Sequence, residues 1–391
     1  MKKHYLLCFL LFLFFAPSKI FSQGSTFTFT TTGTNPTIDT ALAYVGNIWG
    51  DYLNSTVPIK VNVYYINLFG TTLGITVPNG RRDFPTAPVD SVWYPSCLAN
   101  AIEGTELNVG EADMDIFMDN STNWYFGLDG NCPLGKYDFV TVVLHEIGHG
   151  LGFLSLAKLE GDTLGSFGEV TPADIAPLIT SFPFPELNSK YSIFAHFMEN
   201  GSGQSIVDTI LFPNSSNILG DQFKSNAVYF AGPLSVVLNS GNPVRLFAPT
   251  TYESGSSMQH LNESTFSASN PNTLMTPYVG TSEEHHTPGP LTIAILEDIG
   301  WNVNHDVGNE NMLSDLRIEL FPNPVENYAM IRLDKSLENS PLEVIDMYGR
   351  VVLSTVVSVE KGNYFSVDFT SLSKGVYTIR LADGLLKLIK N

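Results

Sequence analysis

The segment at residues 144–153, LHEIGHGLGF, constrains the fold of this chain more than any other. In a helix, His145 and His149 stand at positions i and i+4, so their side chains lie one turn apart on one face. Two imidazoles at that spacing can bind one Zn²⁺, with Glu146 beside them as a general base. The preceding residues are apolar except for one threonine, so we expect this helix to be buried.

After His145, three glycines stand at alternate positions from residue 148 onward. Gly148, Gly150 and Gly152 make an ordinary helix costly, since each Gly is about 1 kcal/mol less favourable than Ala. We therefore expect close packing against the helix, or a turn just after the metal site.

The third ligand of the predicted zinc site is not adjacent in sequence. A catalytic zinc usually has three protein ligands and one open position. The extended motif HExxHxxGxxH places a third histidine six residues after the second. Here Ser155 stands at that position, and serine is not a plausible ligand. The best candidate is His260, far downstream, which is followed by Met275 in the segment Leu-Met-Thr-Pro.

Other residues compete with His260 for this role. Glu169 is the main rival, with Asp174 as a carboxylate that could orient a ligand. His285 and His286 are adjacent and therefore unsuited to chelating one metal together. His196 lies in a segment predicted to be an amphipathic helix, where a packed or exposed histidine is the ordinary case.

The order of these residues resembles that of leishmanolysin-like metzincins, in which HExxHxxG is followed by a long insertion, a distant His and a Met-turn. It also resembles a group of secreted bacterial proteins that share the segment LEDIGW, present here at residues 296–301. The resemblance implies an α+β fold, namely a metzincin-like zincin catalytic domain with a large insertion. It further implies zinc, peptide hydrolysis and a supporting position for Met275 beneath the metal.

In the mechanism implied by this resemblance, Glu146 takes a proton from water and passes it to the leaving amine. We expect a carboxylate to orient one of the imidazoles, with Asp113, Asp115 and Asp138 as the open alternatives. An extended protein or peptide substrate would bind by pairing with an edge strand of the cleft.

The N-terminus has the pattern of a secretory signal peptide at residues 1–22, with Lys2 and Lys3 before a short apolar run. After its removal two cysteines remain, Cys97 and Cys132. In an exported protein this pair favours a disulfide. No other run is apolar and long enough to predict a transmembrane segment.

The composition changes after residue 302. We predict a catalytic domain at residues 23–302, a polar linker at 303–316 and a small all-β sandwich domain at 317–391. The segments FPNP (321–324), VIDMYGRVV (344–352) and LSKGVYTIRL (372–381) resemble the sorting domain of type nine secretion substrates. The resemblance implies recognition by outer-membrane secretion machinery, followed by release or attachment at the cell surface.

A net charge of −19 argues against binding nucleic acid or anionic membranes through a general electrostatic field. The Asp/Asn-rich loop at 119–131 is a weaker candidate for Ca²⁺. The leading functional hypothesis is a secreted zinc endopeptidase. The alternatives are a surface adhesin that keeps the fold without turnover and, less favoured, a zinc hydrolase of a non-peptide bond.

Hydrophobic periodicity predicts several elements. Strands are expected at 26–32 and 59–68, an edge strand at 112–118, and short strands within 227–238. Helices are expected at 37–53, 99–103, 190–200 and 291–300.

Overall fold

The computed structural model describes residues 24–68, 70–178, 180, 186–304, 318–333, 336–360, 364–382 and 384–391. The predicted signal peptide and nearly all of the predicted linker lie outside these ranges. Buried apolar side chains form a large cluster and a smaller one before residue 304, and a separate cluster after residue 318. No helix in the described ranges is both long and apolar enough to cross a membrane.

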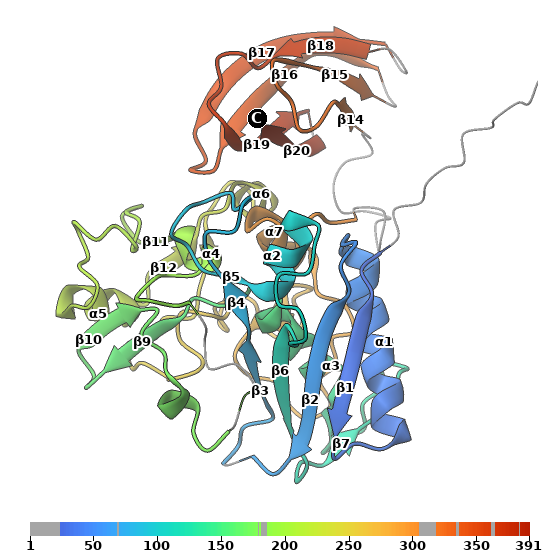
Figure 1. Ribbon diagram of the computed structural model, residues 1–391, viewed down its shortest axis with the longest axis vertical. Coiled ribbons are helices and arrows are strands. Elements are labelled where there is room, and N and C mark those ends of the chain that lie inside the picture. The colour runs from blue at the N-terminus through green and yellow to red at the C-terminus, as the bar shows by residue number, and fades with distance from the viewer. Residues whose placement is uncertain are drawn as a thin grey trace, which may run out of the picture.

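The first part of the chain is built on a four-stranded sheet of order β1-β2-β6-β3 (Figure 1). Strands β1 (Phe27–Thr32), β2 (Ile59–Ile66) and β6 (Met114–Asp119) are parallel. Strand β3 (Gly74–Pro78) runs antiparallel to β6 at the edge. The strands predicted at 26–32 and 59–68 are confirmed.

The prediction of an edge strand at 112–118 is wrong. Strand β6 lies between β2 and β3, and all six of its residues are buried. The alternating carboxylates suggested a solvent face, but Asp115 accepts a hydrogen bond from Asn62 Nδ2 at 2.8 Å. Buried charges persist where partners satisfy them, which a hydrophobicity pattern does not show.

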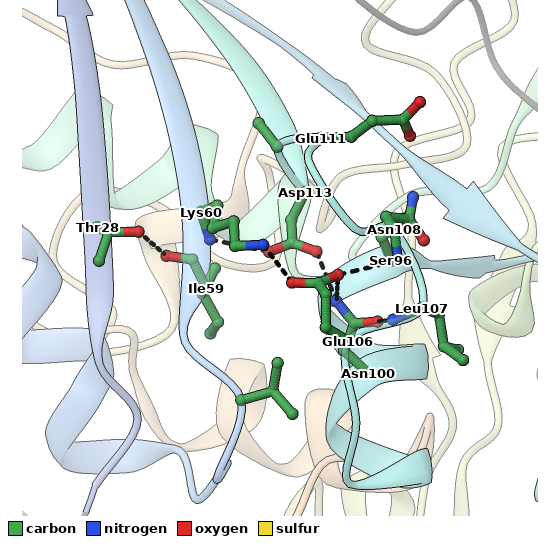
Figure 2. A network of polar contacts seen from close by, with 12 residues as sticks. Thr28, Ile59, Lys60, Ser96, Asn100, Glu106, Leu107, Asn108, Glu111 and Asp113 are labelled. Atoms are coloured by element: carbon green, nitrogen blue, oxygen red, sulfur yellow. Dashed lines mark hydrogen bonds and ion pairs between the residues drawn. The ribbon is translucent and has the colours of Figure 1, made fainter.

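Asp113, just before β6, joins a polar network that connects the sheet to helix α2 (Ser96–Glu103) (Figure 2). Its carboxylate accepts hydrogen bonds from the main-chain N–H of Lys60 at 2.8 Å and from Asn100 Nδ2 at 3.0 Å. Burial raises the pKa of Asp113 to about 7, although the Lys60 N–H opposes the shift. Asp113 therefore acts as a structural link between β2 and α2.

Helices α1 (Pro36–Tyr52) and α3 (Phe139–Gly150) pack against each other, and Figure 1 shows α1 beside strand β1. Asn35 caps α1 by accepting from the N–H groups of Thr37 and Ile38. The indole N–H of Trp49 donates to Leu144 O at 3.2 Å, which ties α1 to α3. The helices predicted at 37–53, 99–103 and 291–300 are confirmed as α1, α2 and α7 (Pro290–Asp298).

The region between α3 and α7 contains short elements and two wrong predictions. The helix predicted at 190–200 is only the short α4 (Ile193–His196), followed by strand β11 (Met198–Asn200). Within 227–238, strand β12 (Val228–Phe230) is followed by helix α6 (Pro233–Leu238) instead of a further strand. Pro233 starts that helix because its fixed φ and missing N–H suit a first helical position.

The remaining elements of the first part are short. They are β4 (Gly80–Arg81), β5 (Tyr94–Pro95), β7 (Trp124–Tyr125), β8 (Tyr137–Asp138), β9 (Ala157–Glu160), β10 (Leu164–Phe167), α5 (Asn217–Phe223), β13 (Val244–Arg245) and the 3₁₀ turns η1 (Pro172–Ile175) and η2 (Thr273–Met275).

The C-terminal part is a sandwich of two antiparallel sheets, as predicted, with orders β14-β15-β18 and β17-β16-β19-β20. Side chains of both sheets share one hydrophobic cluster. The strands are β14 (Ile318–Phe321), β15 (Tyr328–Leu333), β16 (Leu337–Asp346), β17 (Val351–Val359), β18 (Tyr364–Asp368), β19 (Gly375–Leu381) and β20 (Gly384–Lys390). The whole molecule thus has a mixed α+β fold.

The predicted disulfide is not formed, since Cys97 and Cys132 are both free and buried. The Cys97 thiol lies 3.4 Å from Gly150 O, at the end of α3. The Cys132 thiol lies 3.3 Å from Lys136 O, just before the same helix begins. A helix of this length spans about 18 Å, whereas a disulfide needs Cα atoms less than about 7 Å apart. The prediction was wrong because α3 separates the two cysteines.

Candidate metal centre

Helix α3 presents the HExxH segment from a buried position. Asp138 caps the helix by accepting a hydrogen bond from Thr141 N at 2.7 Å. Apart from His145, which is partly buried, every residue of α3 is buried. His145 and His149 therefore project from one face of a helix that the core holds in place.

The glycines after His145 are explained by close packing and by a turn. A side chain at Gly148 would place its Cβ 2.6 Å from Met275 Sδ, and one at Gly150 would lie 2.1 Å from Met114 Sδ. Gly152 has φ +122° just after the helix, a conformation that favours glycine. Both expectations about these glycines are confirmed.

His260 reaches the same point from a distant loop. Leu261 N donates to Met275 O at 2.8 Å, and Phe247 N donates to His260 O at 2.8 Å, so the loop is fixed on both sides. The Nε2 atoms of His145 and His149 lie 3.0 Å apart. The Nε2 atom of His260 lies 3.1 Å from each of them. Among the described residues, these three form the one group of at least three His, Cys, Asp or Glu side chains whose ligand atoms converge.

Main-chain carbonyls orient all three imidazoles. His145 Nδ1 lies 2.6 Å from Leu274 O, His149 Nδ1 lies 2.8 Å from Phe153 O, and His260 Nδ1 lies 2.7 Å from Ser256 O. A carbonyl oxygen only accepts, so each Nδ1 carries the hydrogen and each Nε2 presents a lone pair.

The expectation that a carboxylate orients one ring is wrong. Asp113 and Asp115 are engaged within the sheet, and Asp138 caps α3 at the end away from His149. Loop carbonyls at Leu274, Phe153 and Ser256 occupy the positions where a carboxylate was expected.

The environment keeps the three rings neutral. Burial lowers the pKa of His149 to about 3, and the neighbouring His145 contributes to the shift. Burial also lowers the pKa of His145, and lowers that of His260 well below its ordinary value. Neutral imidazole is the form that binds metal.

The three lone pairs fit a metal ion. Neutral rings with hydrogen on Nδ1 have none on Nε2, so the three Nε2 atoms cannot hydrogen-bond to one another. A tetrahedral zinc with Zn–N distances of about 2.0–2.1 Å separates its nitrogens by about 3.3 Å, close to the observed spacing. The donor set of three imidazoles therefore suits zinc.

Glu146 lies between α3 and edge strand β3 and is 5% exposed. Its Oε2 accepts a hydrogen bond from Thr76 Oγ1 at 2.7 Å, and burial raises the pKa of its carboxyl to about 7. A carboxyl with a pKa near neutrality can both take up and release a proton. Thr76 could not be predicted from the sequence, because nothing in a short strand marks which neighbour a hydroxyl contacts.

Met275 is fully buried in η2 and packs against Gly148 of α3. Its neighbour Leu274 supplies the carbonyl that orients His145. Met275 thus packs against the helix that carries His145 and His149, and its place beneath a metal ion stays a prediction.

The competing residues lie elsewhere. Glu169 is exposed and accepts a hydrogen bond from Ser189 Oγ, while Asp174 pairs with Lys158. His285 Nε2 contacts Glu283, and His286 Nε2 contacts Asp138 at 2.9 Å. His196 packs against aromatic rings instead.

The carboxylates of the loop at 119–131 are used within the protein. Asp119 accepts from Leu68 N, Ser121 and Thr122, and Asp129 accepts from Tyr125 OH at 2.6 Å. No three acidic groups converge there among the described residues. Calcium binding by this loop therefore stays a prediction from the sequence.

Comparison with known proteins identifies one part of the chain. A family described as the secretion system C-terminal sorting domain matches residues 319–391. The predicted resemblance of the C-terminal sandwich to such a domain is confirmed. The domain indicates export through type nine secretion, and so a place at the cell surface or outside the cell.

No curated protein matches the chain. A solved structure of AaCel9A in complex with cellobiose-like isofagomine is 16% identical over 20% of this chain and 15% of that one, with a TM-score of 0.17. The crystal structure of dimeric latent PorU from Porphyromonas gingivalis is 23% identical over 19% of this chain and 9% of that one, with a TM-score of 0.15. The chain thus spans a small part of either protein.

Proposed function

We propose that this protein is a secreted zinc-dependent endopeptidase of metzincin type. The observation that carries the proposal is the convergence of three neutral imidazoles beside a buried carboxyl, formed by His145, His149, His260 and Glu146. This donor set leaves one coordination position open, as a catalytic zinc requires.

The chain's own residues supply binding and proton transfer. Zinc at the three Nε2 atoms would polarise the scissile carbonyl and lower the pKa of water in the site to about 7. Glu146 takes the proton of the attacking water and later gives it to the leaving amine. The carbonyls of Leu274, Phe153 and Ser256 keep the imidazoles in the tautomer that presents Nε2.

Strand β3 offers a way to bind an extended substrate. It pairs with β6 on one side and is the last strand of its sheet in the described ranges. The face of β3 that is turned to α3 contacts Glu146 through Thr76. A peptide that adds to the free side of β3 would gain main-chain hydrogen bonds and lie next to the carboxyl that acts on it.

The decisive experiment compares wild type with Glu146→Gln in the full-length protein after export. We expect one zinc per chain in both, with casein cleavage in wild type and at least about a hundredfold less in Glu146→Gln. Cleavage by Glu146→Gln at the wild-type rate would refute the mechanism. Zinc binding without cleavage of casein or of a mixed peptide library in wild type would favour the adhesin alternative.

A further inference from the structure

Two alternate residues of β3 meet the carboxyl group of Glu146. Thr76 Oγ1 lies 2.7 Å from Glu146 Oε2 and 2.9 Å from the main-chain O of the same residue. Both acceptors belong to Glu146, and the single hydroxyl hydrogen of Thr76 is shared between the side chain and the backbone of Glu146. Because side chains alternate along a strand, Gly74 lies on the same face of β3 as Thr76.

Gly74 provides the space that the carboxyl group occupies. A Cβ at this position would lie 2.6 Å from Glu146 Oε1 and 2.8 Å from its Cγ. Contacts under 3.0 Å between such atoms force something to move. Any residue other than glycine at 74 would therefore displace Glu146.

The opposite face of β3 fixes the strand. Val77 is buried in the smaller hydrophobic cluster with Trp93 and Phe117, and Ile75 packs against that cluster. Thr76 and Gly74 are thus presented to α3 by a strand that is held from behind.

The arrangement distinguishes the two carboxyl oxygens of Glu146. Oε2 accepts a hydrogen bond from Thr76 Oγ1, whereas Oε1 is the atom nearest to the position that a Cβ at Gly74 would take. Thr76 and Gly74 therefore constrain both oxygens of the carboxyl group.

We propose that Thr76 and Gly74 are positioning residues that hold the Glu146 carboxyl group in place for proton transfer, so that the strand predicted to bind the substrate also aligns the base. This proposal rests on the proposed function for its kinetic consequence. Misplacing a catalytic group by about 1 Å can cost about a hundredfold in rate.

The kinetic test compares Thr76→Val, which keeps the shape and loses the hydroxyl, with Thr76→Ser, which keeps the hydroxyl. We expect kcat to fall about 10- to 100-fold in Thr76→Val, with KM within about twofold and zinc content unchanged. Thr76→Ser should stay within about threefold of wild type, and Gly74→Ala should resemble Thr76→Val. Thr30→Val, on an exposed position of β1, is the matched control.

Wild-type kcat in Thr76→Val would overturn the proposal. If Thr76→Val does not fold, Thr76→Ala removes the same hydroxyl with a smaller side chain, and its kcat decides in the same way.

A second readout does not depend on activity. In the metal-free full-length protein, the infrared carboxyl band that disappears in Glu146→Gln belongs to Glu146. We expect this band to shift in Thr76→Val and to remain in place in Thr76→Ser and Thr30→Val. An unshifted band in Thr76→Val would refute the contact, whether or not the protein cleaves peptides. A band that shifts in Thr76→Val, together with a wild type that cleaves nothing, would refute the proposed function and leave the contact intact.

Discussion

At the scale of single residues, the candidate metal centre depends on which nitrogen of each imidazole carries hydrogen. Three main-chain carbonyls settle this at His145, His149 and His260. A carbonyl in a fixed loop cannot be protonated in the neutral pH range, so the orientation of the rings is insensitive to pH there. The loops that provide the carbonyls are therefore as important to the site as the helix.

The first prediction concerns His260. We expect His260→Ala to weaken zinc binding by more than about a hundredfold, since two imidazoles from one helix turn remain. Competition with a chromophoric chelator measures the affinity. His285→Ala is the matched control, because His285 contacts Glu283 instead of the triad. Unchanged zinc affinity in His260→Ala would remove this residue from the ligand set.

The second prediction concerns His196, whose two ring nitrogens are buried without a hydrogen-bond partner in the described residues. Burial lowers its pKa to about 4, against an ordinary value of 6.5. The folded state therefore binds this proton less well than the unfolded chain. The resulting stability is fully present above about pH 6.5 and is lost as the pH falls through about 4.

At about 1.4 kcal/mol per pKa unit, the full loss is about 3–4 kcal/mol, of which about 2–3 kcal/mol occurs by pH 4.5. We expect His196→Phe, which keeps an aromatic ring, to show a smaller loss of unfolding free energy between pH 7 and pH 4.5. Urea denaturation at the two pH values measures it. An equal loss of unfolding free energy in wild type and His196→Phe would contradict the assignment of this loss to His196.

At the scale of secondary-structure elements, α3 is shaped by what packs against its glycines. Gly148 brings the helix onto Met275, whose neighbour Leu274 orients His145. We expect Gly148→Ala to lower the free energy of unfolding by about 1–3 kcal/mol through overpacking, although alanine favours a helix by about 1 kcal/mol. Urea denaturation checks this, and a more stable variant would show that Met275 moves freely.

The elements differ in how well the sequence predicts them. Helix α1 has clear helical periodicity and a capping residue, and strand β2 has a β-branched run. Both elements are found where expected. Strand β6 was misassigned to an edge because its carboxylates are satisfied by Lys60, Asn100 and Asn62, which lie far away in sequence. The HExxH pattern could be recognised from its spacing. His260 could be chosen over Glu169 only from its order with Met275, which resembles that of metzincins. Thr76 could not, because its role depends on the packing of β3 onto α3.

At the scale of the whole molecule, Figure 1 shows the C-terminal sandwich next to the end of the first part that carries α6 and α7, and two side chains make contacts between them. Lys387 Nζ donates to Gly300 O at 3.2 Å, at the carboxyl end of α7. Tyr348 lies with its ring centroid 6.3 Å from that of His196. A cation at the C-terminal end of a helix is favourable because carbonyl groups there lack partners.

We expect Lys387→Met to accelerate hydrogen exchange at residues 299–301 by about tenfold, since a hydrogen bond from a charged donor is worth about 1.5 kcal/mol. Exchange measured by mass spectrometry on the full-length protein checks this. Lys390→Met is the control, because the Lys390 ammonium contacts Asn391 O. Equal exchange in Lys387→Met and wild type would mean that the contact does not hold the two parts together.

The central claim is that three histidines bind one zinc ion, and X-ray absorption at the zinc edge tests it most directly. For the full-length protein loaded with one zinc equivalent, we expect three imidazole nitrogens at about 2.0–2.1 Å and one oxygen ligand. In His260→Ala one imidazole should be lost. A coordination shell with sulfur, or with fewer than three imidazoles in the wild type, would contradict this account.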